Sequence, residues 1–335
     1  VTTRRGDMYE YKGMFSLGAI DGNIQFEGPI VKGKTSFNLA VRRSWFDVLT
    51  VPLYIIANLT FPYGESGKVQ YAMTDLNVSV THLFDKDSRL SMNFYAGADQ
   101  IRYKYTDLHV RYWEGVRHAG ESGHDINARW GNILASLDWK KNFSDDLHLN
   151  TLIYYTRSNT DVGLWDKQWL VGNSNTLNIT DRVLQERNYS RLHDISAKAD
   201  LDWIPSEYHH IRAGAAYIQH LFRPRKVFTM NSTENGEEAY SDNDSYSIDY
   251  NASEVAVYAE DEIALASWFK ANIGLRYDMF SQGDNTYHSF EPRAALRFQL
   301  CQLFHCFQPR RSTRPTKQSN CTQYKSEFYR LWELF

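Results

Sequence analysis

The sequence predicts an all-β protein, and more specifically an antiparallel transmembrane β-barrel. Apolar and polar residues alternate with period two in segment after segment, as strands with two unlike faces require. Short turns alternate with long polar connections along the chain. Aromatic residues make up 15% of the 335 residues although the mean hydropathy is only −0.53. That combination suits wetted β-structure and the aromatic girdles of a barrel.

The alternation defines about twelve strands. Between residues 269 and 278, aromatic and aliphatic side chains occupy the odd positions, and Lys, Asn, Gly, Arg and Asp occupy the even ones. Most segments reach or exceed the roughly 9–11 residues that cross a bilayer at a tilt. In order, the strands lie in residues 9–20, 23–30, 35–45, 69–84, 89–103, 130–141, 147–159, 192–204, 210–222, two within 255–280, and 288–300.

The connections give the predicted sheet two unlike ends. Five short turns begin near residues 31, 85, 142, 205 and 266, spaced 54 to 63 residues apart. Long polar loops are expected between them, near residues 47–68, 104–128, 162–188 and 226–252. Regularly repeated long loops are uncommon in compact soluble domains. Bacterial outer-membrane barrels have short periplasmic turns and long extracellular loops, and we expect the same arrangement here.

Two alternatives to a receptor barrel stay open at this point. A soluble, secreted β-rich carbohydrate-binding protein would also show alternating strands. A plug-free outer-membrane porin would show them too, together with a complete strand set and a constricting loop. In a soluble protein of this kind, the apolar faces of two layers would pack against each other in a dry interior.

Charge and apolar runs exclude several other classes. The formal net charge is −3, and no nucleic-acid binding is expected without a concentrated basic footprint. No stretch of 18 apolar residues occurs, so a transmembrane helix is not predicted. The amino terminus carries no charged-then-apolar secretion signal.

No constellation of residues predicts chemistry. Nucleophile–base pairs, phosphate loops and paired catalytic carboxylates do not stand out, so we expect no enzyme activity, cofactor or metal site. His118 and His124 lie in a glycine-rich segment and are interpreted as solvated loop residues. Asp200 and Asp202 share one strand face with Lys198, and we interpret the three as a charged ladder that faces water.

Aromatic residues of the predicted external loops are the candidate ligand-binding residues. Flat rings on such loops can stack on sugar rings or cover an apolar ligand. An aromatic belt at the membrane boundary is the competing interpretation. The candidates are Tyr112, Trp113, Trp165 and Trp169.

Four sequence stretches resemble TonB-dependent outer-membrane receptors of the Bacteroidetes type. "VYAEDEIALASWFKANIGLRYDMF" and "FEPRAALRFQL" are similar to barrel hairpins with an acidic strand, a short turn, an "N-x-G-L-R-Y-D" strand and an "E-P-R" strand. "NIQFEGPIVKGKTSFNLAVRRSWFDVLT" resembles the first barrel hairpin, and "VTTRRGDM" the link that leaves the plug. The resemblance covers residues 1 to 300.

The resemblance implies nutrient uptake across the outer membrane of a Gram-negative bacterium. The cargo would be a siderophore, an oligosaccharide or a peptide. Partners would be outer-membrane lipid, the TonB complex acting on the full-length parent, and a surface lipoprotein as a further candidate. The family barrel has about 22 strands around a plug, whereas this chain shows about twelve and lacks the plug and the TonB-contacting segment. We therefore expect an incomplete barrel that does not transport by itself, because free sheet edges are not tolerated in a bilayer core.

The chain is expected to have three parts. Residues 1–8 end the plug-to-barrel link, residues 9–300 form the partial barrel, and residues 301–335 form an irregular tail. The tail holds Cys301, Cys306 and Cys321, has no glycine and does not alternate. We interpret it as translation in a shifted frame or otherwise non-native sequence, with a divergent loop as the alternative.

Overall fold

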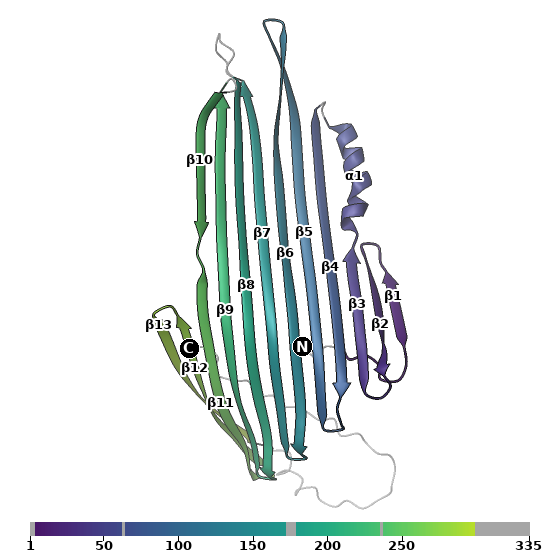
Figure 1. The fold of residues 1–335 in the computed structure, drawn as a ribbon, viewed down its shortest axis with the longest axis vertical. Helices are drawn as coiled ribbons and strands as arrows, with labels where there is room; N and C mark the ends of the chain where they lie inside the picture. The colour runs from purple at the N-terminus through teal and green to yellow at the C-terminus, as the bar shows by residue number, and fades with distance from the viewer. Residues whose placement is uncertain (1–3, 62–63, 172–178, 235–236, 299–335) are drawn as a thin grey trace, which may run out of the picture. The chain divides into compact units, whose positions relative to one another are not determined.

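The described residues form a thirteen-stranded antiparallel sheet and one helix (Figure 1). The computed structural model describes residues 4–61, 64–171, 179–234 and 237–298. The predicted tail, residues 301–335, and its three cysteines lie outside the described residues. The elements are β1 (Lys12–Leu17), β2 (Asp21–Val31), β3 (Thr35–Ser44), α1 (Phe46–Thr60), β4 (Glu65–Leu83), β5 (Ser88–Trp113), β6 (Val116–Ser144), β7 (Leu147–Val171), β8 (Ile179–Ser206), β9 (His209–Glu234), β10 (Glu237–Ser247), β11 (Tyr250–Ala266), β12 (Phe269–Gln282) and β13 (Asn285–Phe298).

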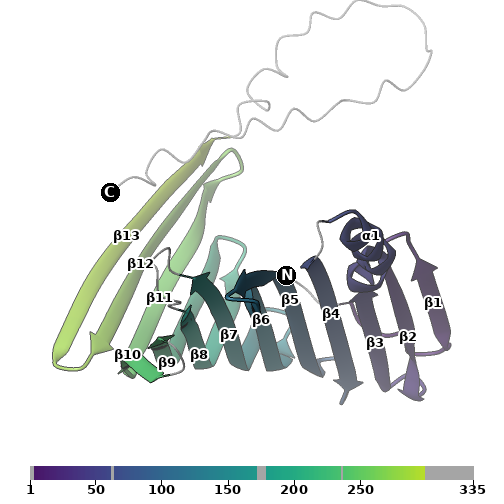
Figure 2. The same ribbon diagram turned by 90° about the horizontal axis from the view of Figure 1, so that it is seen from above.

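Nearly every strand pairs with its neighbours in sequence. The order runs β1 to β9 and then β11, β12 and β13, while β10 pairs with the upper part of β9. β9 therefore pairs with β10 over residues 225–234 and with β11 over residues 209–222. Within the described residues β1 and β13 do not pair with each other, so the sheet is open. Figure 2, which looks at the strands from above, shows a single layer of strands. The prediction of an incomplete antiparallel barrel is confirmed.

The five predicted tight turns lie together at one end of the sheet (Figure 1). Two residues separate β6 from β7, β8 from β9, and β11 from β12, whereas three separate β2 from β3 and four separate β4 from β5. Short connections fix the register of neighbouring strands, and a slip by one residue would turn every side chain to the wrong face. The turns therefore help to keep the apolar and the polar side chains on opposite faces of the sheet.

The prediction of long polar loops at the other end is wrong. β5 to β9 contain 25 to 29 residues each, so the strands continue through most of residues 104–128 and 162–188. Residues 226–252 hold the end of β9 together with β10, a strand that the sequence did not suggest. A paired ladder satisfies backbone N–H and C=O groups that a loop would leave to water, and polar residues do not prevent pairing.

A two-residue turn explains the longest of these hairpins. Glu114 and Gly115, between β5 and β6, have φ angles of 48° and 79°. Positive φ at both central residues is what a type I′ hairpin turn requires, and its twist matches that of the strands. Trp113 and Val116 pair directly beside the turn.

The predicted loop at 47–68 contains α1 instead. Hydrogen bonds from both of its halves join α1 to β4. The Gly67 N–H donates to Asn58 Oδ1 at 2.8 Å. The Thr50 hydroxyl donates to the Val69 carbonyl oxygen at 3.1 Å. Figure 2 shows α1 standing off the layer of strands on the side of β1 to β4. No helix in the described part of the chain combines the length and the apolar character needed to cross a membrane.

The segment before β1 is tied to the sheet by charges. The Arg4 guanidinium contacts the Glu27 carboxylate at 2.8 Å. The Asp7 carboxylate accepts hydrogen bonds from the Lys12 ammonium and from the backbone N–H groups of Tyr9 and Glu10. These contacts, above all the one from Lys12, lower the pKa of Asp7 to about 2.

Candidate functional site

The pairing register divides the sheet into an apolar face and a polar face. Met92 pairs with Leu137, Leu137 with Ile153, and Ile153 with Ala197, so these side chains share one face. We call the apolar rows of this face the apolar band. On the central strands the band consists of Leu90, Met92, Phe94 and Ala96; Trp139, Leu137, Ala135 and Ile133; Leu149, Thr151, Ile153 and Tyr155; and Leu201, Ala199, Ala197 and Ile195.

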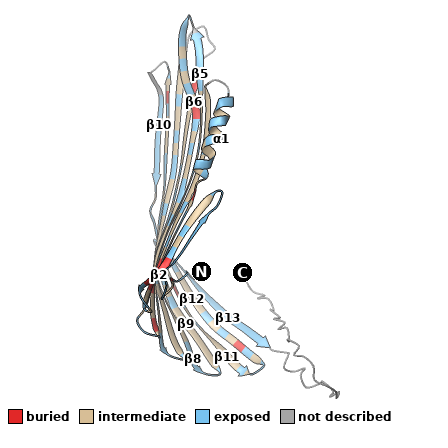
Figure 3. Ribbon diagram, turned by 90° about the vertical axis from the view of Figure 1, so that its right-hand side faces the viewer, coloured by how far each residue is buried: buried red, intermediate tan, exposed pale blue. Residues whose placement is uncertain are grey.

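The apolar band is exposed rather than covered. Met92 is 51% exposed, Ile153 49% and Ile195 52%, and Ile273 of β12 reaches 58%. Figure 3 shows intermediate and exposed residues over nearly all of the sheet, with buried residues in small patches. Among the described residues, the buried apolar side chains are those of Trp169, Ala256 and Ala271. The described sheet therefore has no dry interior of its own, and its apolar face needs an apolar environment.

Hydrogen bonds between strands connect the polar face. The Ser79 hydroxyl donates to Asn93 Oδ1 at 2.9 Å, and the Asn93 amide donates to Ser136 Oγ at 3.3 Å. Lys198 contacts Asp200 at 3.0 Å, and Asp202 contacts His210 at 2.7 Å. The interpretation of residues 198–202 as a charged ladder on one face agrees with this arrangement.

Three tyrosine–aspartate hydrogen bonds recur on the polar face. Tyr71 donates to Asp99 at 3.0 Å, Tyr95 to Asp75 at 2.9 Å and Tyr258 to Asp200 at 2.6 Å. In two of these hydrogen bonds, the tyrosine side chain lies over a glycine of the strand between the two partners or beside them. A Cβ on Gly97 would lie 2.2 Å from the Tyr95 hydroxyl oxygen, and a Cβ on Gly214 would lie 2.5 Å from the Tyr258 ring. These glycines make room for rings that lie along the sheet.

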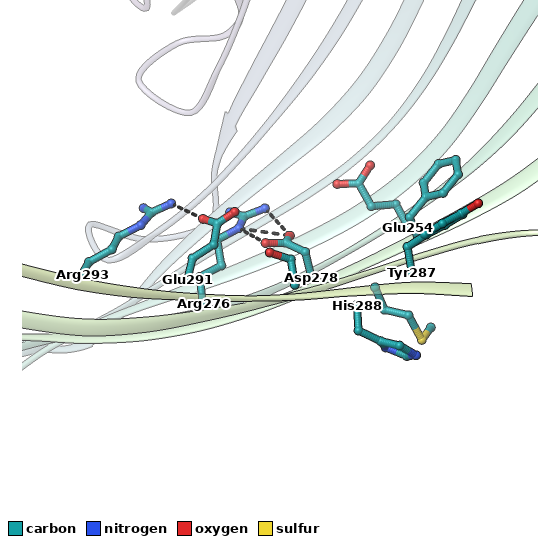
Figure 4. Close-up of a pocket in the computed structure, with 10 residues that line it drawn as sticks. Glu254, Arg276, Asp278, Tyr287, His288, Glu291 and Arg293 are labelled. Atoms are coloured by element: carbon teal, nitrogen blue, oxygen red, sulfur yellow. Dashed lines mark hydrogen bonds and ion pairs between the residues drawn. The ribbon is translucent and has the colours of Figure 1, made fainter. Parts of the chain in front are cut away.

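A charged pocket lies on β11 to β13. Its volume is about 510 Å³, and its lining includes Glu254, Arg276, Asp278, Tyr287 and Arg293. The Arg276 guanidinium contacts the Asp278 carboxylate at 2.7 Å, and Arg293 contacts Glu291 at 3.0 Å. In Figure 4 the labelled acids and arginines stand on one side of the ribbon and His288 on the other. Adjacent groups of both signs can bind a polar or zwitterionic molecule.

Sequence patterns within single strands do not reveal this pocket. Its lining comes from three strands, and residues of one strand show only which face they share. The useful signal was the "LRYDMF" alternation, which correctly places Arg276 and Asp278 on one face.

The structure does not bring the predicted aromatic residues together. Tyr112, at the end of β5, is 69% exposed, whereas Trp169 is 9% exposed and stacks on His109 with ring centroids 6.0 Å apart. Trp165 pairs in the β6–β7–β8 ladder, and Trp113 ends β5. No ring contact joins Tyr112, Trp165 and Trp169 in the part of the chain described. Their role in ligand binding stays a prediction.

The two histidines that were predicted to lie in a loop, His118 and His124, lie in β6 instead. His124 Nδ1 contacts an Asp166 carboxylate oxygen, and His118 pairs with Arg111 across the hairpin. Among the described residues, no three histidine, cysteine or acidic side chains gather as metal ligands would.

Comparisons with known proteins agree with this architecture. The family model described as "TonB dependent receptor-like, beta-barrel" matches residues 75–305, which is more than half of the chain. No curated protein matches. Two similar solved structures are the RagAB peptide importer in the closed-closed state (12% identity, TM-score 0.51) and the siderophore receptor PiuA from Acinetobacter baumannii (11% identity, TM-score 0.49).

The alignments cover most of this chain but less than half of each solved structure. The match spans 86% of this chain and 35% of the RagAB chain, and 88% of this chain and 47% of PiuA. The chain therefore spans less than half the length of either structure. At these identities the likeness concerns the fold alone, and the RagAB match is the one that supports it.

Proposed function

Because this chain belongs to the TonB-dependent receptor-like β-barrel family, we propose that it forms part of the wall of an outer-membrane receptor for nutrient uptake. The apolar band meets lipid, and the polar face borders the water-filled lumen. Backbone hydrogen bonds close between strands, so the wall needs no water within the hydrocarbon layer. The end with the five predicted turns lies toward the periplasm, and the long hairpins extend outside the cell.

One observation carries this proposal: the same register that exposes the apolar band places the hydrogen-bonded polar network on the opposite face. A soluble protein would cover the band with a second layer. A porin would share the wall, but family membership favours a receptor.

The cargo belongs to the proposal as well. Siderophores, oligosaccharides and peptides are the candidate classes, and RagAB is itself a peptide importer. The charged pocket on β11–β13 would suit a peptide, since it presents both signs of charge. Tyr112, Trp113, Trp165 and Trp169 would contribute from the outer hairpins. Coupling to the TonB complex and association with a surface lipoprotein complete the proposed set of partners.

Site-directed labelling tests which face meets lipid. In a background with Cys301, Cys306 and Cys321 replaced by Ser, a fluorophore is attached at Leu137→Cys on the apolar band. The matched control is Ser136→Cys, the next residue, on the polar face. We expect nitroxide lipids to quench the Leu137 label strongly and a water-soluble quencher to reach the Ser136 label instead.

The opposite result would overturn the proposal. Equal quenching at both positions, or recovery of the labelled protein in buffer without detergent, would show that the band does not face lipid.

A further inference from the structure

A belt of arginines lies on the lipid-facing side, directly beyond the apolar band. The row above Tyr155 and Ile195 begins with Arg157 opposite His193, and the next row sets Arg191 directly opposite Arg223. Arg129, Arg187 and Arg225 follow within two further rows. We call Arg129, Arg157, Arg187, Arg191, Arg223 and Arg225 the arginine belt.

The opposite face at the same height lacks this charge. Asn188 pairs with Lys226 and Ser190 with Pro224 there. Lys226, the charged residue among these four, contacts Glu186 at 3.0 Å. The belt is therefore a property of the lipid-facing side and not a general feature of the barrel rim.

The arginines crowd one another around Tyr189. The guanidinium carbons of Arg187, Arg191 and Arg225 lie 5.6, 5.9 and 5.8 Å from the centroid of the Tyr189 ring. Arg225 also donates to the Tyr189 hydroxyl at 3.2 Å. Stacking on a ring attracts a cation, but like charges placed directly opposite on neighbouring strands repel.

Carboxylates neutralise only part of the belt. Arg187 forms a bidentate contact with Asp161, at 2.8 and 2.6 Å, and Arg223 lies 3.4 Å from Asp249. Arg129, Arg157, Arg191 and Arg225 have no carboxylate within ion-pair distance among the described residues. Six arginines against two carboxylates leave four positive charges, and an anion would relieve their repulsion.

A depression beside the belt offers space for a headgroup. It measures about 450 Å³, and its lining includes Ala98, Gly131, the two arginines Arg43 and Arg129, and the two carboxylates Asp99 and Asp161. Asp161 is already paired with Arg187. A Cβ on Gly131 would lie 2.9 Å from the Gly97 carbonyl oxygen, so the floor has no room for a side chain. Ala98 and Gly131 pair directly, in the row that continues through Asn159 to Arg191.

We propose that the arginine belt binds the phosphate groups of phosphorylated lipids in the outer leaflet. Guanidinium groups bind phosphate in a bidentate manner and carry little hydration. Basic residues at the membrane surface attract anionic headgroups. Only a lipid is held at this height by its own acyl chains, beside the apolar band. The inference rests on the proposed lipid-facing orientation and is independent of the cargo.

The test compares two lipids on the same protein. The complete receptor whose wall contains this chain is reconstituted in nanodiscs with equal amounts of lipid A carrying its phosphates and lipid A without them. Lipids that stay bound after transfer to detergent are counted by mass spectrometry. We expect a preference for the phosphorylated lipid of about fivefold per arginine engaged.

Two adjacent residues give a matched pair of variants. Arg225→Gln removes a charge from the belt, whereas Lys226→Gln removes one from the opposite face at the same height. The preference should fall several-fold in Arg225→Gln, should vanish in the triple variant Arg191→Gln, Arg223→Gln, Arg225→Gln, and should persist in Lys226→Gln. If the triple variant does not insert into the membrane, the comparison of Arg225→Gln with Lys226→Gln still shows whether the arginine belt binds the phosphorylated lipid.

Three outcomes would contradict the inference. These are equal retention of both lipids by the wild-type protein, a full preference in the triple variant, and a loss in Lys226→Gln as large as that in Arg225→Gln. Displacement of the lipid by millimolar inorganic phosphate would assign the site to free phosphate instead. The fluorophore at Leu137→Cys, measured in the same nanodiscs, distinguishes failure of the two proposals. If the label does not contact lipid, the proposed orientation of the sheet is wrong. If the label contacts lipid but the phosphorylated lipid is not preferred, only the proposed role of the arginine belt is wrong.

Discussion

At the scale of single residues, glycines on the polar face determine where tyrosine rings can lie. Gly214 pairs with both Asp200 and Tyr258, and the Tyr258 hydroxyl crosses above it to the aspartate. The sequence predicted that Asp200 faces water. It could not predict the tyrosine, because Tyr258 and Asp200 are 58 residues apart and meet only through the register of three strands.

We expect Gly214→Ala to destabilise the protein by about 1–3 kcal/mol, the usual cost of overpacking. The new Cβ would lie 2.5 Å from the Tyr258 ring and 2.8 Å from the Asp200 carboxylate. Unfolding by denaturant in micelles measures the change. Gly163→Ala is the matched control, since its Cβ would meet nothing closer than the Asn127 carbonyl oxygen at 3.9 Å.

A double-mutant cycle sharpens this test. On a Tyr258→Ala background the ring is absent, so Gly214→Ala should cost much less. An equal cost on both backgrounds would show that the ring is not the cause.

At the scale of elements, the sequence identified the strand cores but not their ends. Alternation of apolar and polar residues marks a strand where one face is apolar, and the band that supplies this face ends near Ala96 and Ile133. Beyond it the apolar side chains change faces: Arg102 and Asn127 lie on the face of the band, whereas Ile101 and Ala128 lie on the other. The alternation therefore loses its phase while the backbone ladder continues. The Glu-Gly pair at 114–115 was the available signal for a hairpin, and it resembles the Asn-Gly and Asp-Gly pairs of type I′ turns.

Hydrogen exchange distinguishes a paired hairpin from a loop. Within residues 104–111 and 118–125, we expect slow exchange for the backbone amides that donate across the β5–β6 ladder. Amides at the turn, Glu114 and Gly115, should exchange fast and serve as the internal reference. Exchange of all these amides within seconds would restore the interpretation as a loop.

At the scale of the whole molecule, one register governs both faces of the sheet. Ile153 sits in the middle row of the apolar band, and Tyr154, the next residue, sits on the polar face between Ser136 and Ser196. The fold class was predictable because this division recurs in every strand. The pocket on β11–β13 and the arginine belt were not, since each is assembled from several strands.

We expect Ile153→Arg to destabilise the protein in bilayers by about 2–4 kcal/mol, the cost of a basic residue at the middle of a lipid-facing strand. Tyr154→Arg is the control and should cost clearly less, since its side chain faces water. Reversible unfolding in lipid vesicles gives both values. A larger penalty for Tyr154→Arg would reverse the assignment of the two faces.

The neighbour-to-neighbour strand order has a consequence for how such walls change in evolution. A hairpin bounded by two tight turns leaves and re-enters at the same end, so duplicating or deleting one preserves the direction of every other strand. Each remaining strand also keeps the same side toward lipid. Since barrel diameter grows with strand number, the girth of the pore can be altered in steps of two strands without redesigning the rest.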